Sequence, residues 1–185
     1  MRLTMFVLAV SLMLVSCGRS AAGEDTNMGM HHGGQSAPGY NWTTQDDASF
    51  LYAMIEHHKG AVEMAEAVAG TTKDPDVARW AKAIIESQQR EIALMERMNT
   101  AIGLRDNGAG DMMREEMRAM MAMPHSSDAD RDFVVMMIPH HAGAVDMSLP
   151  ALVESENAAI RTLARDIIAA QATEIHEFKE WLDKK

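Results

Sequence analysis

The stretch that decides the fold of this chain occurs twice, as FLYAMIEHHKGAVEM at residues 50–64 and as FVVMMIPHHAGAVDM at residues 133–147. When residues 50–98 are laid on residues 133–181 without a gap, fifteen of the 49 positions are identical. The identities include two adjacent histidines, a glycine and two methionines in each copy. A repeat of this kind indicates one structural unit that is built twice.

Each copy predicts a helical hairpin. In the first copy, a helix begins near Ser49 and ends at Gly70, GTTKDPD forms the turn, and a second helix runs from Pro75 to Met98. Proline is well suited to the first turn of a helix. The second copy predicts helices near residues 132–153 and 156–183.

Two such hairpins give four helices, so the predicted fold is all-α, an antiparallel four-helix bundle over residues 46–185. The segment between the two copies, residues 103–131, contributes a Gly-rich link and a short Met-rich helix.

The chain before the bundle predicts export. Residues 1–16 carry one positive charge, at Arg2, and an apolar run too short to span a membrane, which is typical of a signal peptide. The run ends in LVSC, a pattern typical of bacterial lipoproteins. We therefore expect Cys17 to be lipidated, which would anchor the protein to a membrane facing the periplasm or the cell exterior; a plain secretory signal is the alternative. Residues 17–45, rich in Gly, Ser, Asn and Asp, form the predicted flexible tether.

Composition limits the class of partner. The formal net charge is −10 at pH 7, so no nucleic-acid partner is expected, because phosphate binding needs a basic face. Cations are the more natural partners. Cys17 is the one cysteine, which excludes an internal disulfide, a zinc finger and an iron–sulfur cluster. Methionine is unusually frequent, with 18 in the chain.

Polar residues interrupt the apolar faces of the predicted helices. At 100° per residue, His57 and His58 flank the apolar stripe of the first helix, and Gln88 and Glu91 lie within the stripe of the second. Folding the hairpin near residue 72 brings these four residues to one level of the bundle. Met54 joins this level, and Met64 lies two turns along from His57. The counterparts in the second copy are Met137, His140, His141, Met147, Gln171 and Glu174.

Two explanations fit these polar residues, since an unpaired buried carboxylate costs several kcal/mol. One is a structural network, in which Glu91 accepts a hydrogen bond from one imidazole and Gln88 from the other. The second is a metal site. Thioether and imidazole ligands outside the cytoplasm suit copper, with Cu(I) first and Cu(II) or Ag(I) as further candidates. The recurrence of the same set in both copies favours the metal.

The predicted metal ligands are therefore the paired histidines and their methionine neighbours: Met54, His57, His58, Met64, Met137, His140, His141 and Met147. The polar residues behind them would orient the imidazoles from outside the ligand sphere: Gln88, Glu91, Gln171 and Glu174. The tether offers an accessory site at Met28, Met30, His31 and His32, with an inert linker as the alternative. The methionines of residues 103–131 either bind metal or pack on the bundle.

One position differs between the copies, where Glu56 of the first corresponds to Pro139 of the second. Within a helix, Pro139 removes one backbone hydrogen bond and frees the Val135 carbonyl. The resulting bend either re-aims His140 or serves packing alone.

The pattern MIPHHAGAVDM, followed by AAQATEIHEFKEWL, resembles the bacterial family labelled domain of unknown function 305. The resemblance covers residues 46–183, which include both copies. It implies a ferritin-like four-helix bundle. It also implies copper chemistry, because some members are exported copper-binding proteins of the CopM type that are linked to copper resistance.

The leading hypothesis is thus a lipid-anchored, extracytoplasmic metal-binding protein that is not an enzyme. It would sequester Cu(I) or Ag(I), or hand copper to a transfer partner. The alternatives are a ferritin-like metal-dependent oxidoreductase and a structural bundle of the cell envelope with buried His–Glu–Gln networks. The sequence leaves open whether the copies form one shared site or two, and it leaves the oligomeric state open.

Overall fold

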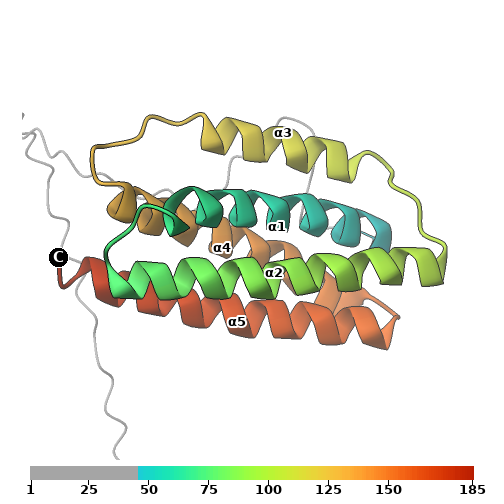
Figure 1. Cartoon of the computed structure of the whole chain (residues 1–185). Helices are drawn as coiled ribbons and strands as arrows, with labels where there is room; N and C mark the ends of the chain where they lie inside the picture. Colours follow the sequence, from blue (N-terminus) through green and yellow to red (C-terminus); the bar gives the residue numbers. More distant parts are fainter. Residues whose placement is uncertain (1–45) are drawn as a thin grey trace, which may run out of the picture. The chain divides into compact units, whose positions relative to one another are not determined.

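The computed structural model describes residues 46–185, and this part of the chain is entirely helical. The helices are α1 (Asp47–Ala69), α2 (Pro75–Ile102), α3 (Ala109–Met121), α4 (Ala129–Glu154) and α5 (Ala158–Leu182). The predicted hairpins are α1 with α2 and α4 with α5, and the partners of each hairpin pack along one another (Figure 1). The all-α prediction is therefore confirmed, and the predicted Met-rich helix is α3.

Local sequence explains where the first hairpin bends. The carboxylate of Asp46 accepts a hydrogen bond of 2.7 Å from the Ser49 amide at the start of α1. The carboxylate of Asp74 does the same for the first turn of α2, whose first residue is Pro75. The helix α2 continues four residues beyond the expected Met98, until Gly103 ends it in the left-handed conformation with φ 77°.

The two hairpins meet along α1 and α4, and also along α2 and α5. The indole of Trp80 on α2 donates a 2.6 Å hydrogen bond to Glu177 on α5, and its ring meets Phe178 edge-on at 5.0 Å. The fifth helix, α3, lies along the outer side of α1 (Figure 1). The bundle is thus covered on one side by a helix that has no counterpart in the second hairpin.

The buried apolar side chains form two clusters. One surrounds the start of α1 and the end of α4 and includes Phe50, Met54, Met95, Met147 and Ile167. The other surrounds the end of α1 and the start of α4 and includes Met64, Trp80, Met137, Phe178 and Trp181. The middle of α1 and α4, which carries the paired histidines, lies between these clusters.

The close fit of α3 against α1 depends on Gly60. A Cβ atom at this position would lie 2.9 Å from Sδ and 3.1 Å from Cγ of Met117 on α3. We expect Gly60→Leu to lower the free energy of unfolding in urea by about 1–3 kcal/mol, because the added side chain would push α3 away from α1. The control is Gly70→Leu, since a Cβ atom at Gly70 meets nothing within 4 Å. Equal effects of the two variants would contradict the packing argument.

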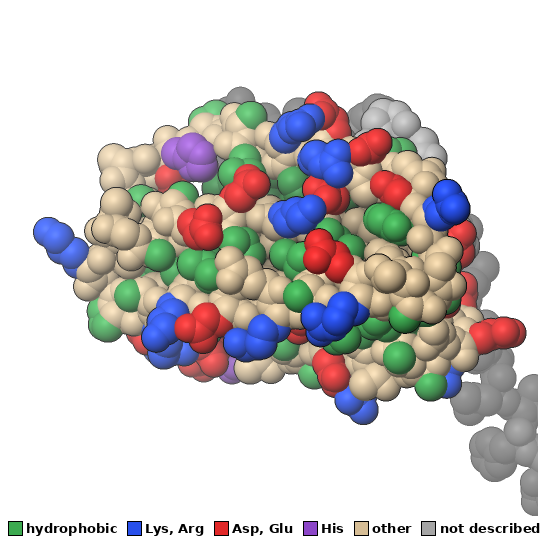
Figure 2. Space-filling view, turned by 45° about the vertical axis from the view of Figure 1, so that its right-hand side comes forward, with side chains coloured by type: hydrophobic (Ala, Val, Ile, Leu, Met, Phe, Trp, Pro, Cys, Tyr) green, Lys and Arg blue, Asp and Glu red, His purple; other side chains and the backbone are tan. Residues whose placement is uncertain are grey.

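The surface of the described part mixes charges of both signs. Figure 2 shows acidic and basic side chains interspersed on one face, with hydrophobic side chains between them. That face offers no concentrated positive charge of the kind that binds phosphate. None of the helices within residues 46–185 is both long and apolar enough to cross a membrane.

Candidate metal centre

Four imidazoles form a continuous row through the middle of the bundle. His57 and His58 come from α1, His140 and His141 come from α4, and all four side chains are buried. The two inner rings, His57 and His140, face each other across the α1–α4 contact with centroids 3.7 Å apart. Each outer ring follows its neighbour at 6.4 Å in α1 and at 6.0 Å in α4. The order of rings is therefore His58, His57, His140, His141.

A glutamate carboxylate lies at each end of this imidazole row and contacts the outer ring. Nε2 of His58 lies 2.7 Å from Glu91 on α2, and Nε2 of His141 lies 2.6 Å from Glu174 on α5. About a quarter of each glutamate side chain is exposed. An ionised carboxylate only accepts hydrogen bonds, so each outer Nε2 carries the proton that it donates. In the neutral form of such a ring, the nitrogen that carries a lone pair is Nδ1.

One inner ring is held by the backbone instead. Nε2 of His140 lies 3.0 Å from the carbonyl oxygen of His57. A carbonyl only accepts, so Nε2 of His140 is also a donor. Burial lowers the pKa of both inner rings well below 6.5, and the charge that a neighbouring imidazole would carry lowers it further. The inner pair is therefore neutral at pH 7.

The four Nδ1 atoms of the row share an unusual feature: each is buried and has no hydrogen-bond partner. A buried acceptor without a partner costs on the order of 1–3 kcal/mol of folding stability. Four such acceptors in one layer would therefore destabilise the metal-free bundle. A neutral imidazole whose Nε2–H is bonded to a carboxylate or carbonyl presents the lone pair with which histidine binds metals. The residues present thus fit a metal ion that accepts nitrogen ligands.

The glutamines of the same level do not complete a hydrogen-bond network. Gln88 and Gln171 are both buried, and Oε1 of each lacks a partner. The structural-network hypothesis expected Gln88 to accept a hydrogen bond from an imidazole, and the structure contains no such bond. Its other part is present, because Glu91 does bond His58. The glutamines thus add two buried acceptors without partners.

The four methionines predicted as ligands lie above and below the row. Met54 and Met147 belong to one apolar cluster, and Met64 and Met137 to the other, all with at most 9% of their surface exposed. The antiparallel course of α1 and α4 explains this pairing between copies. The structure thus brings soft sulfur atoms to both sides of the row, and ligation by these atoms remains a prediction.

Sequence reasoning gave no role to Gly143. A Cβ atom at this position would lie 3.4 Å from Nε2 of His57, so the absence of a side chain leaves room for that ring. The glycine recurs at position 60 of the first copy. A glycine in the interior of a helix lowers helix stability by about 1 kcal/mol relative to alanine. Its presence at both positions therefore indicated that another group packs closely against the helix there.

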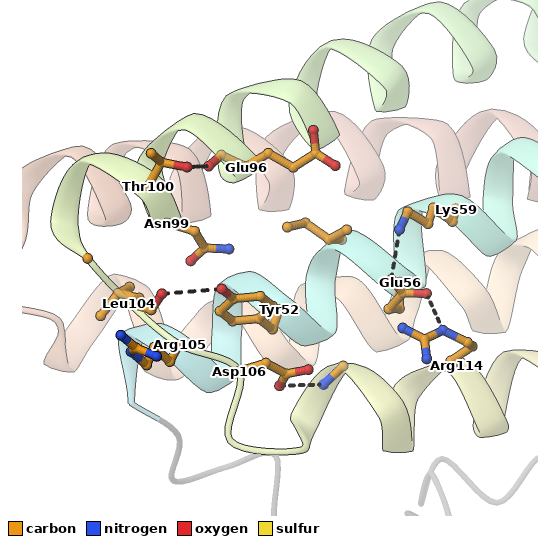
Figure 3. Close-up of a pocket in the computed structure, with 13 residues that line it drawn as sticks. Tyr52, Glu56, Lys59, Glu96, Asn99, Thr100, Leu104, Arg105, Asp106 and Arg114 are labelled. Atoms are coloured by element: carbon orange, nitrogen blue, oxygen red, sulfur yellow. Dashed lines mark hydrogen bonds and ion pairs between the residues drawn. The ribbon is translucent and has the colours of Figure 1, made fainter.

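The difference between Glu56 and Pro139 has a structural reason. The carboxylate of Glu56 accepts hydrogen bonds from Lys59, at 2.8 Å, and from Arg114 of α3, at 2.9 Å (Figure 3). Burial alone would raise the pKa of Glu56, but these two cations hold it below its ordinary value. Pro139 is exposed on the surface of α4, where no helix of residues 46–185 packs in the way that α3 packs on α1. Glu56 therefore attaches the Met-rich helix to the first copy.

This contact lies in a recess of about 560 Å³ between α1, the end of α2 and the start of α3. Figure 3 shows Tyr52 donating a hydrogen bond to the Leu104 carbonyl in its wall. Charged side chains of both signs line it, and Glu56 there is paired with cations of the same recess. Its described contacts serve the attachment of α3.

The methionines of residues 103–131 divide between core and surface. Met113 and Met117 are buried against α1, as the packing alternative expected. Met112, Met120 and Met121 are half-buried, and Met123 is 47% exposed. The predicted lipidation site, Cys17, lies outside the described residues, and so do the predicted accessory metal ligands of the tether: Met28, Met30, His31 and His32.

The lowered pKa of the two inner imidazoles predicts how the stability of the metal-free protein depends on pH. His57 and His140 bind protons less readily in the folded protein than in the unfolded chain, where the pKa is near 6.5. Acid therefore favours unfolding of the metal-free protein. Its free energy of unfolding in urea should fall between pH 6.5 and 5.5, with a slope approaching about 1.4 kcal/mol per pH unit for each ring.

The double variant His57→Gln/His140→Gln should lose this dependence, whereas His176→Gln, which changes a surface histidine, should keep it. A wild-type stability that does not change over this interval would contradict the argument.

Comparison with known proteins gives the same fold and a connection to copper. The profile of the family described as "Domain of unknown function (DUF305)" matches residues 18–99 and 47–182. The structure is similar to "CopM in the Cu(I)-bound form", with 28% identity and a TM-score of 0.64 over 76% of this chain and 98% of that one. The Ag-bound form of CopM gives 30% identity and a TM-score of 0.65 over the same shares.

Two further relatives carry no functional description. A DUF305 fragment from Deinococcus radiodurans is 26% identical, with a TM-score of 0.62 over 80% of this chain and 100% of that one. Uncharacterized protein L153 of Acanthamoeba polyphaga mimivirus is 45% identical over 47 residues, 25% of this chain. That match covers 31% of the viral protein's length.

Proposed function

This chain belongs to the DUF305 family, and from that premise we propose that it is an extracytoplasmic protein that binds Cu(I) in the imidazole row of its bundle. The observation that carries the proposal is the set of four buried Nδ1 atoms without partners. The protein would sequester the ion or hand it to a copper-transfer partner. CopM, which is similar over most of the described chain, has been solved with Cu(I), with Cu(II) and with Ag bound.

The chemistry of the row suits a soft monovalent ion. Imidazole nitrogens would be the first ligands, and the methionines of the flanking clusters would add soft sulfur, which favours Cu(I) and Ag(I) over harder ions. A buried cation needs compensating negative charge. Glu91 and Glu174 supply it from the two ends of the row while they hold the outer rings in orientation.

A binding role fits the donor set better than catalysis. Among residues 46–185, no three side chains drawn from His, Cys, Asp and Glu are placed to hold one metal ion together. Within the described residues, the carboxylates that hydrogen-bond to the row are those of Glu91 and Glu174. Both facts support storage or transfer by few ligands per ion rather than the carboxylate-rich site of a ferritin-like oxidase.

The localisation belongs to the same proposal. Residues 1–16 resemble a signal peptide, and lipidation of Cys17 would hold the bundle at the membrane surface. The tether would then place Met28, Met30, His31 and His32 between the anchor and the bundle, where they could take up an ion before it reaches the core.

The test is a competition for Cu(I) between the full chain and a chromophoric chelator. All proteins carry alanine at the four tether residues Met28, Met30, His31 and His32, so that binding there does not contribute. Changing His57, His58, His140 and His141 to alanine should abolish binding tight enough to compete with the chelator. The control His176→Ala, which changes an exposed histidine, should bind as tightly as its parent.

Unchanged affinity of the quadruple variant, with helix content retained by circular dichroism, would refute the proposal. The row would then be a structural network.

A further inference from the structure

A second group of soft ligands lies outside the imidazole row. A pocket of about 210 Å³ opens between the end of α1, the end of α3 and the start of α4. Three helices each contribute a methionine to its wall: Met64 from α1, Met121 from α3 and Met136 from α4. His125 and Asp132 complete the polar part of the lining. Methionine, histidine and aspartate residues thus line one small pocket.

These methionines differ from those that fill the core. Met113 and Met117 of α3 are buried and contribute packing alone. Met121 and Met136 are half-buried and line an open pocket, so a solute can reach their side chains. Met64 is 9% exposed and forms the inner wall. Leucine would fill an apolar wall equally well, whereas a thioether adds a ligand for soft metal ions.

Hydrogen bonds fix the backbone segment next to His125, one of the residues that line the pocket. The backbone amide of Ser126 donates a 2.6 Å hydrogen bond to one oxygen of Asp132, and its hydroxyl donates a 2.8 Å bond to the other. These bonds fix the segment that carries His125, whose Nδ1 lies 4.0 Å from Asp132. The His125 side chain is 56% exposed, so its ring remains free to turn toward an ion. A carboxylate beside a histidine is the usual partner that orients a metal ligand.

We propose that this pocket is a second binding site for Cu(I) or Ag(I), with Met64, Met121, Met136 and His125 as its ligands. The site goes beyond the imidazole row and uses none of its histidines, although it takes Met64, one of the methionines predicted to add sulfur to the core site. Met136 precedes His140 by one helical turn, about 6 Å, and Met64 follows His57 by two turns, about 10 Å. The pocket therefore lies one to two helical turns from the row along α4 and α1, and its role as a loading position rests on the proposed core site.

The experiment is a titration with silver nitrate, in chloride-free buffer, of the full chain labelled with ¹³C at the methionine methyl groups and with ¹⁵N in the histidine rings. The four tether residues are again alanine. The methyl signals of Met121 and Met136, assigned with Met→Leu variants, should shift as Ag(I) is added. His125→Ala should weaken this response at least tenfold. His176→Ala should not, because His176 is also an exposed histidine beside a carboxylate but lies on α5. Met112→Leu, a half-buried change on α3 outside the pocket, should also leave the response intact.

The outcomes separate this site from the core. If Met121 and Met136 do not respond to excess Ag(I), the second site is refuted, even when the imidazole signals of His57 and His140 shift and the core proposal stands. If Met121 and Met136 respond while the core imidazoles do not, the pocket is supported and the core proposal fails. A full response in His125→Ala would refute the ligand set proposed for the pocket.

Discussion

Replacing Glu91 and Glu174 together by glutamine is expected to weaken Cu(I) binding by about 10²- to 10⁴-fold. Loss of a carboxylate that supports a metal-bound histidine typically costs 10–100-fold, and these two act at opposite ends of the row, so their effects should multiply. Glutamine keeps an oxygen that can accept from the imidazole. The charge that would compensate a buried cation is lost, while the hydrogen bond can remain.

Affinity in this experiment is measured by chelator competition, and helix content is checked by circular dichroism. The control is Glu96→Gln, the same change on α2 at an exposed residue, which should leave the affinity unchanged. Unaltered binding by the double variant would mean that the glutamates have a structural role only.

Replacing Phe178 by alanine should give the largest loss of stability, about 3–5 kcal/mol in urea unfolding. The ring is fully buried and meets Trp80 at 5.0 Å, His141 at 5.5 Å and Phe133 at 6.4 Å. Truncation would leave a cavity next to the imidazole row. Because a domain has only about 5–15 kcal/mol to lose, the variant should be close to unfolding at physiological temperature.

The first copy supplies the matched control for this experiment. It has Met95 at the position of Phe178, so Phe178→Met reproduces a side chain that already fills the equivalent place. The methionine variant should lose less than about 1.5 kcal/mol. Equal losses in the two variants would show that the contacts of the aromatic ring, rather than the filled volume, stabilise this cluster.

The sequence predicted those parts of the structure that depend on local spacing. Helical periodicity and the repeat gave the two hairpins, and folding the first hairpin back brought His58 level with Glu91, a contact that the structure contains at 2.7 Å. The helix bounds differed by a few residues: α2 continues four residues beyond Met98 until Gly103 ends it, and α4 begins at Ala129 rather than near residue 132. Spacing within a hairpin is enough to predict such contacts, since two adjacent helices have few ways to align.

The contacts between the copies could not be predicted in this way. His57 and His140 are 83 residues apart, and their rings meet only because α1 crosses α4 at this level. The rotation of the side chain then determines that Nε2 of His140 is hydrogen-bonded and that its Nδ1 has no partner. The spacing of residues along the sequence does not indicate this rotation. The role of Glu56 likewise depends on α3 packing against α1, since its partner Arg114 belongs to the linker helix.

The single helix α3 makes the two halves of a duplicated core unequal in local stability. On the covered side, α1 is attached to α3 by Glu56 and by the fit of Gly60 against Met117. On the other side, Val135 and Pro139 of α4 face solvent, and Pro139 lacks the amide that would complete the helix ladder. Local opening should therefore require less free energy around His140 than around His57. Two nearly identical sequence motifs would then differ in how fast their ligands become exposed.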